Sequence, residues 1–432
     1  MGVNLPSRGV RVMKTLDSDN QPLGEDDKKK TKQSVSVRQY SIVAICIFMQ
    51  ALVIGAYLYS FTLWVKPWSA EFSASSTEIM LVPTIFLYAN AIVFFFLGKY
   101  LDAFPRRTVV ITGLLCFSLS MFLISISSTL SFIYLVYLII VPVAVLFAGP
   151  AAAITLASQV FEERRGLAIG AVGLGTSIGG IVMPHFAAFA IEDWGWRSAN
   201  QALAIFGLVL IPFAFIALGA TKRVTIDEKT EQEAQREPSR VFFRRPEFWL
   251  CILASTGAYF VFMAVQLNMA PIALEYDFAT EETAFTISLF TAGMFIGKLL
   301  AGFLSDRIDA RIVFLGIGFL MVAALFLMTM QFGHPVLLAA FFLFGIGAGG
   351  VIPLKAILLA GLFGPKHLGR VMGLAAPFVT LYSLGPIFAA FVWDIYKSYV
   401  PVLYVMIAIL VLTVPFVLRL PKMVPATHAP GK

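Results

Sequence analysis

Long apolar runs separated by short polar segments occupy the chain from Ser41 onward. A helix needs about 20 apolar residues to cross the hydrocarbon layer of a bilayer, and twelve runs approach or exceed that length. They lie at 41–65, 78–97, 108–128, 131–160, 167–190, 199–220, 246–270, 283–304, 312–331, 335–362, 369–393 and 398–418. Backbone groups in lipid must be bonded within their own segment, and the runs are too long for barrel strands. The pattern predicts an all-α membrane protein with twelve transmembrane helices.

The second half of the chain repeats features of the first half. The segment 184–189 recurs 202 residues later at 386–391, with Pro, Phe, Ala, Ala and Phe at matching positions. Two pseudo-symmetric halves of six helices are a known construction of secondary transporters, with the substrate site between them. We expect an N-terminal tail at 1–40, a first half at 41–220, a linker at 221–245, a second half at 246–420 and a C-terminal tail at 421–432. Transport is therefore the leading hypothesis.

The composition supports a membrane protein and disfavours an enzyme. Hydrophobic residues make up 59% of the chain, charged residues only 13%, and the mean hydropathy is +0.85. The three cysteines, Cys46, Cys116 and Cys251, all fall in apolar runs, without metal-ligand spacing or an even set for disulfides. Because no nucleophile motif or phosphate-cradling loop occurs either, we expect no enzymatic activity, no metal and no cofactor.

The distribution of Lys and Arg predicts the orientation. If both tails lie on one side, the opposite side holds only Lys66, Arg197 and Lys397, and two lysines fall within spans. Lys and Arg concentrate on the cytoplasmic side of membrane proteins, so we expect both termini in the cytoplasm and a multi-pass protein of a bacterial inner membrane. The formal net charge of +7 then points to lipid headgroups rather than nucleic acid as its partner.

Two loops carry the same pattern half a chain apart. Gly98, Asp102, Arg106 and Arg107 follow the second run, and Gly302, Asp306, Arg307 and Arg311 follow the eighth. Either loop alone is compatible with ordinary cytoplasmic charge. Together they resemble the loop motif of the major facilitator superfamily. The resemblance implies that the glycines allow close helix approach, and that the charged residues form a gate that breaks and reforms as the halves rock.

Further segments resemble the monocarboxylate transporter branch, which includes proteins like the oxalate–formate antiporters. They are 57–78, 161–180, 195–197 and 363–374. The glycine-rich segment 175–180 lacks the Gly-Pro pair expected of drug exporters. The resemblance implies a small carboxylate substrate and a functional monomer.

Lys298 is the first candidate for substrate contact. An ionised side chain within the bilayer costs about 2.5 to 3.5 kcal/mol even on insertion scales, so its presence needs a reason. Monocarboxylate transporters resemble this chain but carry an arginine there, and the family's cation meets the substrate carboxylate. A lysine keeps the charge without the bidentate fork of arginine. The alternative is that Lys298 reaches the headgroups by snorkelling.

Lys355 is a second cation within a span, roughly 12 Å from the cytoplasmic end of its helix at 1.5 Å per residue. By resemblance, the tenth span lines the cavity, and two cations near the path would suit a dicarboxylate. The alternatives are that Lys355 closes a gate or pairs with a carbonyl freed by Pro353.

Polar residues in lining spans complete the candidate substrate site. Gln50 and Tyr57 are seven residues apart and are expected to share a helix face, as are Tyr259 and Gln266. The weaker candidates are Tyr59, Asn90 and Asn268. An amide in lipid more commonly bonds a neighbouring helix, and we expect His185 to be packed and neutral.

The means of coupling departs from the resemblance. Many relatives carry an acid four residues before the cation, where this chain has Met294, and no carboxylate lies deep in any run. Protons remain a candidate partner only through a lysine or His185. Exchange of one anion for another is the alternative.

These patterns predict an alternating-access transporter of small organic anions, with monocarboxylates as first candidates. A dicarboxylate or anion exchanger that uses both lysines is the alternative within transport. A transporter-like receptor that binds without translocating is the alternative outside it.

Overall fold

The computed structural model describes residues 25–98, 100–160, 165–218, 240–330, 332–364 and 367–422. Within these ranges every regular element is helical. The predicted tail up to residue 24, the predicted linker up to residue 239 and the predicted C-terminal tail from residue 423 lie outside the described residues.

The first half contains six spans. Its elements are α1 (Glu25–Ile54), the π-helix η1 (Gly55–Tyr59), α2 (Phe61–Phe72), α3 (Ser76–Leu97), α4 (Tyr100–Ala103), α5 (Arg106–Ser125), α6 (Leu130–Ala148), α7 (Pro150–Val160) and α8 (Arg165–Leu218). α8 comprises two spans that meet at Gly195, whose φ of 78° and ψ of 159° are not helical. Glycine adopts such a conformation without strain, because it has no Cβ.

The second half also contains six spans. Its elements are α10 (Arg240–Phe243), α11 (Pro246–Leu267), α12 (Met269–Glu275), α13 (Thr280–Ser305), α14 (Ala310–Thr329), α15 (His334–Phe363), α16 (Leu368–Val379), the 3₁₀ turn η3 (Thr380–Ser383), α17 (Leu384–Tyr396) and α18 (Val400–Leu418). Eleven helical stretches of the described chain are long and apolar enough to cross a membrane. The stretch 171–218 bends at Gly195 and supplies two spans, which confirms the predicted twelve.

Several elements differ from the hydrophobic pattern. α1 begins at Glu25, within the predicted tail, because Glu, Lys and Gln favour helix although they are polar. The run at 131–160 is divided at Gly149, where α6 ends and Pro150 begins α7. The first run contains a π-helix at 55–59. Hydropathy detects the part of a helix that lies in lipid, and it is insensitive to such changes of helical geometry.

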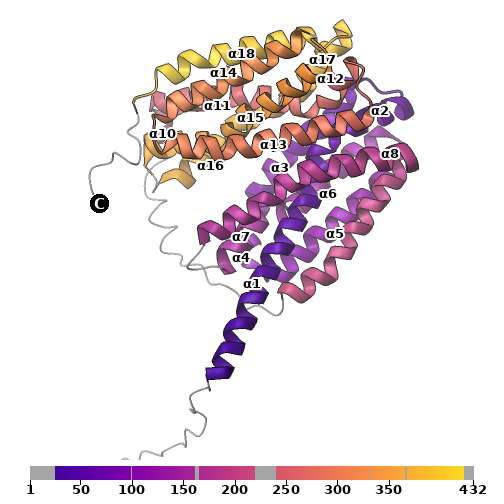
Figure 1. The fold of residues 1–432 in the computed structure, drawn as a ribbon, viewed down its shortest axis with the longest axis vertical. Helices are drawn as coiled ribbons and strands as arrows, with labels where there is room; N and C mark the ends of the chain where they lie inside the picture. The colour runs from indigo at the N-terminus through magenta and orange to yellow at the C-terminus, as the bar shows by residue number, and fades with distance from the viewer. Residues whose placement is uncertain are drawn as a thin grey trace, which may run out of the picture.

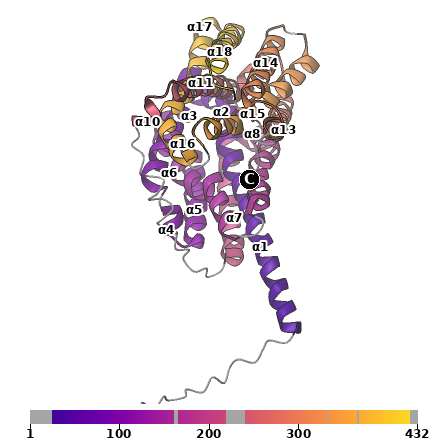
Figure 2. The same cartoon turned by 90° about the vertical axis from the view of Figure 1, so that its left-hand side faces the viewer.

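The two halves form two bundles that meet at one end of the molecule. In Figure 1 the helices converge where α2, α8, α12 and α17 are labelled, and they diverge toward α4, α7, α10 and α16. Figure 2 shows the start of α1 extending away from the bundles. We call the end of the molecule toward which α4, α7, α10 and α16 lie the terminal face. The opposite end, which carries the α2–α3 turn and Gly195, is the distal face.

Glycines set the closest helix contact in the second half. Gly293 and Gly297 of α13 lie four residues apart and face Gly345 and Gly349 of α15. A Cβ on any of the four would collide with the backbone of the partner helix. Small residues at this spacing allow close helix packing in lipid, where dispersion replaces the hydrophobic effect as the attraction. The two helices consequently form a rigid pair that carries both Lys298 and Lys355.

We predict that Gly349→Ala lowers the unfolding temperature of the detergent-solubilised protein, because the new methyl group would fall on the Met294 carbonyl. Overpacking of this kind costs about 1 to 3 kcal/mol. The matched control is Gly316→Ala in α14, where a Cβ meets no atom within 4 Å. Thermal unfolding followed by tryptophan fluorescence measures both variants. Equal unfolding temperatures for the two variants would contradict the packing argument.

Candidate functional site

Hydrogen bonds between the two halves lie near the distal face. The Thr62 hydroxyl accepts the Ala270 backbone N–H at 2.8 Å, and the Ser288 hydroxyl donates to the Ile181 carbonyl at 2.8 Å. The Thr84 hydroxyl lies 3.2 Å from the Ser383 carbonyl. Contacts between the halves join α8 to α13, α3 to η3 and α17, and the α2 region to α11 and α12.

The terminal face lacks comparable contacts. Among the described residues, no more than isolated contacts join α4 or α7 to the second half, or α10 or α16 to the first. The halves are therefore joined at the distal face and separated at the terminal face, as their divergence in Figure 1 also shows.

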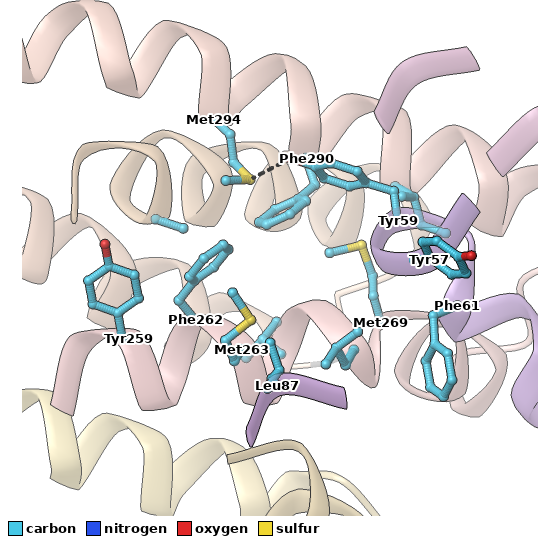
Figure 3. Packing of buried hydrophobic residues seen from close by; sticks show 14 of the residues in the cluster. Tyr57, Tyr59, Phe61, Leu87, Tyr259, Phe262, Met263, Met269, Phe290 and Met294 are labelled. Atoms are coloured by element: carbon cyan, nitrogen blue, oxygen red, sulfur yellow. Dashed lines mark hydrogen bonds between the residues drawn. The ribbon is translucent and has the colours of Figure 1, made fainter. Parts of the chain in front are cut away.

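A packed layer of aromatic and methionine side chains lies below the distal bonds (Figure 3). The Tyr59 hydroxyl of the first half points at the Met294 sulfur of the second, 3.9 Å away. Phe290 packs between Phe262 and Phe344, with ring centroids 6.3 and 6.1 Å apart. Tyr59 and Met294 are almost fully buried. This layer is a buried contact between the two halves, below the hydrogen bonds of the distal face.

Lys298 lies one helical turn from Met294 toward the terminal face. Residues 291, 294 and 298 share one face of α13, and both Thr291 and Met294 contact the first half. Lys298 consequently projects from the face that is directed at the opposite half. α13 continues to Ser305, so Lys298 lies roughly 10 Å inside the helix end at 1.5 Å per residue. Its side chain is half-buried, and within the described residues it makes no ion pair or hydrogen bond.

Lys355 lies beside an aromatic pair. Its ammonium nitrogen is 5.1 Å from the centroid of the Tyr259 ring, a distance at which a cation is attracted to the ring face. The Tyr259 and Tyr382 ring centroids are 5.5 Å apart. The three residues come from α15, α11 and η3, so they form one cluster within the second half. The sequence analysis selected Lys355 and Tyr259 but not Tyr382, which lies in the 3₁₀ turn that interrupts the eleventh span.

Gln50 and Tyr57 turn into the first half and do not come together. The Gln50 amide donates to the Val172 carbonyl at 2.9 Å. The Tyr57 hydroxyl bonds Ser120 in α5, and its ring lies 5.3 Å from that of Phe117. Tyr57 lies within the π-helix at 55–59, and a π-helix changes the register on which the prediction of a shared face depended.

The remaining amides divide into paired and unpaired groups. The Asn268 amide donates to the Ala264 and Pro386 carbonyls, and its oxygen accepts from the Tyr399 hydroxyl. It therefore joins α11 to its neighbours. In contrast, Gln266 is 3% exposed, and neither of its amide atoms has a partner within the described residues. The Asn90 oxygen is likewise buried without a partner there. Unpaired buried amides are costly, so Gln266 and Asn90 are suited to a polar ligand.

The two charged loops lie at the terminal face. Arg107 of the first loop packs its guanidinium on the ring of Phe215, and Arg307 of the second packs on Phe303. Arg311 forms an ion pair with Asp309 at 2.7 Å and donates to the Leu420 carbonyl. Each of these contacts lies within one half. Asp309 is a partner that the sequence analysis did not select.

The other members of the loops are only partly described. Gly98 caps the end of α3, and Asp306 caps the end of α13. Arg106 begins α5, and the side chain of Asp102 lies outside the described residues. A Cβ at Gly302 would meet no atom within 4 Å, so the expected close helix approach at this glycine is not made in this arrangement.

Two further groups at the interface had no clear signal in the sequence. The His185 Nδ1 lies 3.1 Å from the Ser288 hydroxyl of the other half, and Asp394 contacts the start of α3. The sequence analysis considered His185 only as a packed residue or a proton carrier, and the contacts between the halves could not be predicted because the partners lie far away along the chain. Within the described residues, no group of three or more potential metal ligands occurs.

Comparisons with known proteins agree on one family. The model of the Major Facilitator Superfamily matches residues 43–287 and 258–432. The Bacillus subtilis (strain 168) protein named uncharacterized MFS-type transporter YcxA is 24% identical over 361 residues, covering 78% of this chain and 84% of that protein. The cis,cis-muconate transport protein of Acinetobacter baylyi is 27% identical over 295 residues, covering 66% and 70%.

A solved structure has a similar fold. It is a bacterial homologue of the human lysosomal transporter Spinster, in an inward-facing and unoccupied conformation. The TM-score is 0.70 at 15% sequence identity, and the match covers 89% of this chain and 96% of that chain.

We predict that Lys298→Met raises the stability of the protein without ligand, because it removes an unpaired charge from the bilayer region. The gain is expected to be on the order of 2 kcal/mol. The control is Lys66→Met at the distal face, where the side chain is exposed. Thermal unfolding in detergent measures the difference. A lower unfolding temperature for Lys298→Met would mean that Lys298 has a stabilising partner in the protein.

Proposed function

The chain belongs to the Major Facilitator Superfamily, and from this premise we propose that it carries small organic anions, with monocarboxylates as the first candidates. It is a multi-pass membrane protein of a family of transporters with small-molecule substrates. The finer assignment to the monocarboxylate transporter branch rests on the sequence resemblance. The terminal face is the cytoplasmic face in this proposal, because it carries most of the Lys and Arg residues.

The observation that carries the proposal is the unpaired ammonium of Lys298. It lies within a span and on the face of α13 that is directed at the first half. A carboxylate entering from the terminal face would form charge-assisted hydrogen bonds with it. Gln266 and the Asn90 oxygen, which are buried without partners within the described residues, are further candidates for polar contact during the transport cycle, and Tyr59 belongs to the buried layer on the distal side of Lys298.

The charge of Lys298 also explains why one anion would be exchanged for another. Closing the two halves around a bare ammonium would remove it from water without a partner, which is costly. Closing them around an ammonium–carboxylate pair costs less. The empty protein is then expected to change orientation slowly and the loaded protein quickly, so that one anion is exchanged for another. Met294 fits this scheme, because it leaves Lys298 without a resident acid one turn away.

A dicarboxylate is the second candidate substrate, and Lys355 is the observation that favours it. Its ammonium is a second cation within the spans and lies by the Tyr259 ring. The Acinetobacter baylyi relative is named for transport of cis,cis-muconate, which is an unsaturated dicarboxylate. One carboxylate would meet Lys298 and the other Lys355. The Tyr259 and Tyr382 rings would pack against the unsaturated carbons between them.

The two charged loops are proposed to gate the terminal face. In the present arrangement Arg107, Arg307 and Arg311 contact groups of their own half. When the halves close at the terminal face, these side chains come within reach of the opposite half. Gly98 and Gly302 would then allow the close helix approach that is absent here.

We predict that Lys298→Ala and Lys298→Gln lose carboxylate binding, whereas Lys298→Arg retains part of it because the charge is kept. Binding is measured as the rise in unfolding temperature of purified protein with a panel of lactate, benzoate, succinate and cis,cis-muconate, since a ligand of the folded state stabilises it. Lys66→Gln, at the exposed distal face, is the control and should behave as wild type. Carboxylate binding by folded Lys298→Ala protein at wild-type affinity would contradict the assignment.

Lys355→Gln is predicted to separate the two substrate classes. For a monocarboxylate the dissociation constant should stay close to that of the wild type. For a dicarboxylate it should rise by at least a decade, which corresponds to about 1.4 kcal/mol. Calorimetric titration with benzoate and with cis,cis-muconate gives both values from one preparation. If Lys355→Gln also lost affinity for benzoate, Lys355 instead of Lys298 would be the contact of its single carboxylate, which would contradict the assignment of Lys298.

A further inference from the structure

Asp394 joins the two halves at the distal face. It lies in the last turn of α17, and its carboxylate accepts hydrogen bonds from the start of α3 in the opposite half. The Thr77 backbone N–H lies 2.9 Å from Oδ2, the Thr77 hydroxyl 2.5 Å from the same oxygen, and the Ser76 N–H 3.3 Å from Oδ1. Three donors thus converge on one carboxylate that is separated from them by more than 300 residues of chain.

The start of α3 is suited to hold this carboxylate. The first N–H groups of a helix have no partner within it, and the helix dipole makes this end positive. Ser75 and Glu78 form a capping box, in which each side chain accepts a hydrogen bond from the backbone N–H of the other residue. The backbone N–H groups of Ser76 and Thr77 have no partner in the capping box, and both donate to the Asp394 carboxylate. The first half therefore caps α3 only in part, and the second half completes the cap.

This contact differs in kind from the other bonds between the halves. Thr62, Thr84, Ser288 and Thr291 bond backbone groups through neutral hydroxyls. Asp394, in contrast, contributes a carboxylate. Hydrogen bonds to an ionised acceptor are roughly twice as strong as neutral ones, so the Asp394 contact is expected to contribute most to this part of the closure.

The charged groups around Asp394 leave it available for this contact. Lys397, on the same helix end, lies 4.0 Å from Oδ1 and is largely exposed. Glu275 is held within the second half by the Ser398 hydroxyl and the Tyr399 N–H. Burial raises the pKa of the Tyr399 phenol well above its usual value, and the nearby carboxylates of Glu275 and Asp394 add to the effect. Tyr399 is consequently neutral and does not compete as an anion.

The contact is also close to water. Ser76, Trp393 and Lys397 line a cavity of about 830 Å³ that lies between the halves at the distal face. When the halves separate there, water can solvate both the carboxylate and the freed N–H groups. The contact can therefore break and reform without leaving a polar group buried and unpaired, as a reversible closure requires.

We propose that Asp394 and the start of α3 form a latch that holds the distal face closed. The latch favours the arrangement described here over one that is open to the distal side, and transport requires its release in every cycle. This role concerns the conformational equilibrium of the protein and holds whichever solute is carried.

The experiment measures the distance between the two halves at the distal face by double electron–electron resonance between two spin labels. Spin labels are placed at Ser128, in the α5–α6 loop, and at Glu281, at the start of α13, after replacement of the three native cysteines. Asp394→Asn is the test variant, because the amide keeps the size of the side chain but loses the charge. Thr77→Val removes one donor from the other side of the latch. Glu275→Gln is the matched control, since Glu275 caps a helix of its own half.

Asp394→Asn and Thr77→Val are each expected to raise the ratio of distal-open to distal-closed protein by about tenfold. The double variant should add little to Asp394→Asn, because both changes remove the same contact. Glu275→Gln should keep the wild-type distances. Folding is checked by gel filtration of each variant. Wild-type distance distributions in both folded latch variants, or a shift in Glu275→Gln of the same size, would overturn the proposal.

Discussion

The cost of an unpaired polar group in hydrocarbon determines where this chain places its charges and its hydrogen bonds. Most ionised side chains lie near the two faces of the bundle, and several hydroxyls within spans bond carbonyls of their own or a neighbouring helix. Against this background, a cation without a partner within the described residues is an exception that needs an explanation. Lys298 is such an exception, and Gln266 is its neutral counterpart. Both lie in the second half, on helices whose other residues reach the first half.

The contacts between the halves are concentrated toward the distal face, and Lys298 lies on the terminal side of them. Bonds and packed side chains join the halves at the distal face, from the Asp394 contact down to the layer of Tyr59 and Met294. Toward the terminal face the halves diverge, and the charged loops contact only their own half. An anion that enters from the terminal face would meet Lys298 before it reaches the closed layer. The same charge that attracts the substrate then opposes closure of the empty protein, which links binding to exchange.

The spans and the two halves were predictable because hydropathy and an internal repeat are local properties of the sequence. Breaks such as the one at Gly149 follow from proline and glycine, and these too can be read locally. The direction of a side chain is different, because it depends on helix register and on neighbours. Gln50 and Tyr57 therefore point into the first half, and Tyr57 lies in a π-helix that no sequence pattern predicts. Asp394 was beyond prediction, since its partners Ser76 and Thr77 belong to the other half. Lys298 and Lys355 were found because charge within an apolar run is conspicuous.

The central claim is that the protein moves carboxylates across the membrane by exchange, and counterflow in proteoliposomes tests it most directly. Vesicles containing the purified protein are preloaded with an unlabelled carboxylate that stabilises it, and uptake of the same radiolabelled compound is followed. Preloading is predicted to accelerate uptake more than an imposed proton gradient does. Binding without any protein-dependent uptake would show a receptor instead of a transporter. Accumulation driven by the proton gradient alone, and abolished by a protonophore, would contradict exchange as the means of coupling.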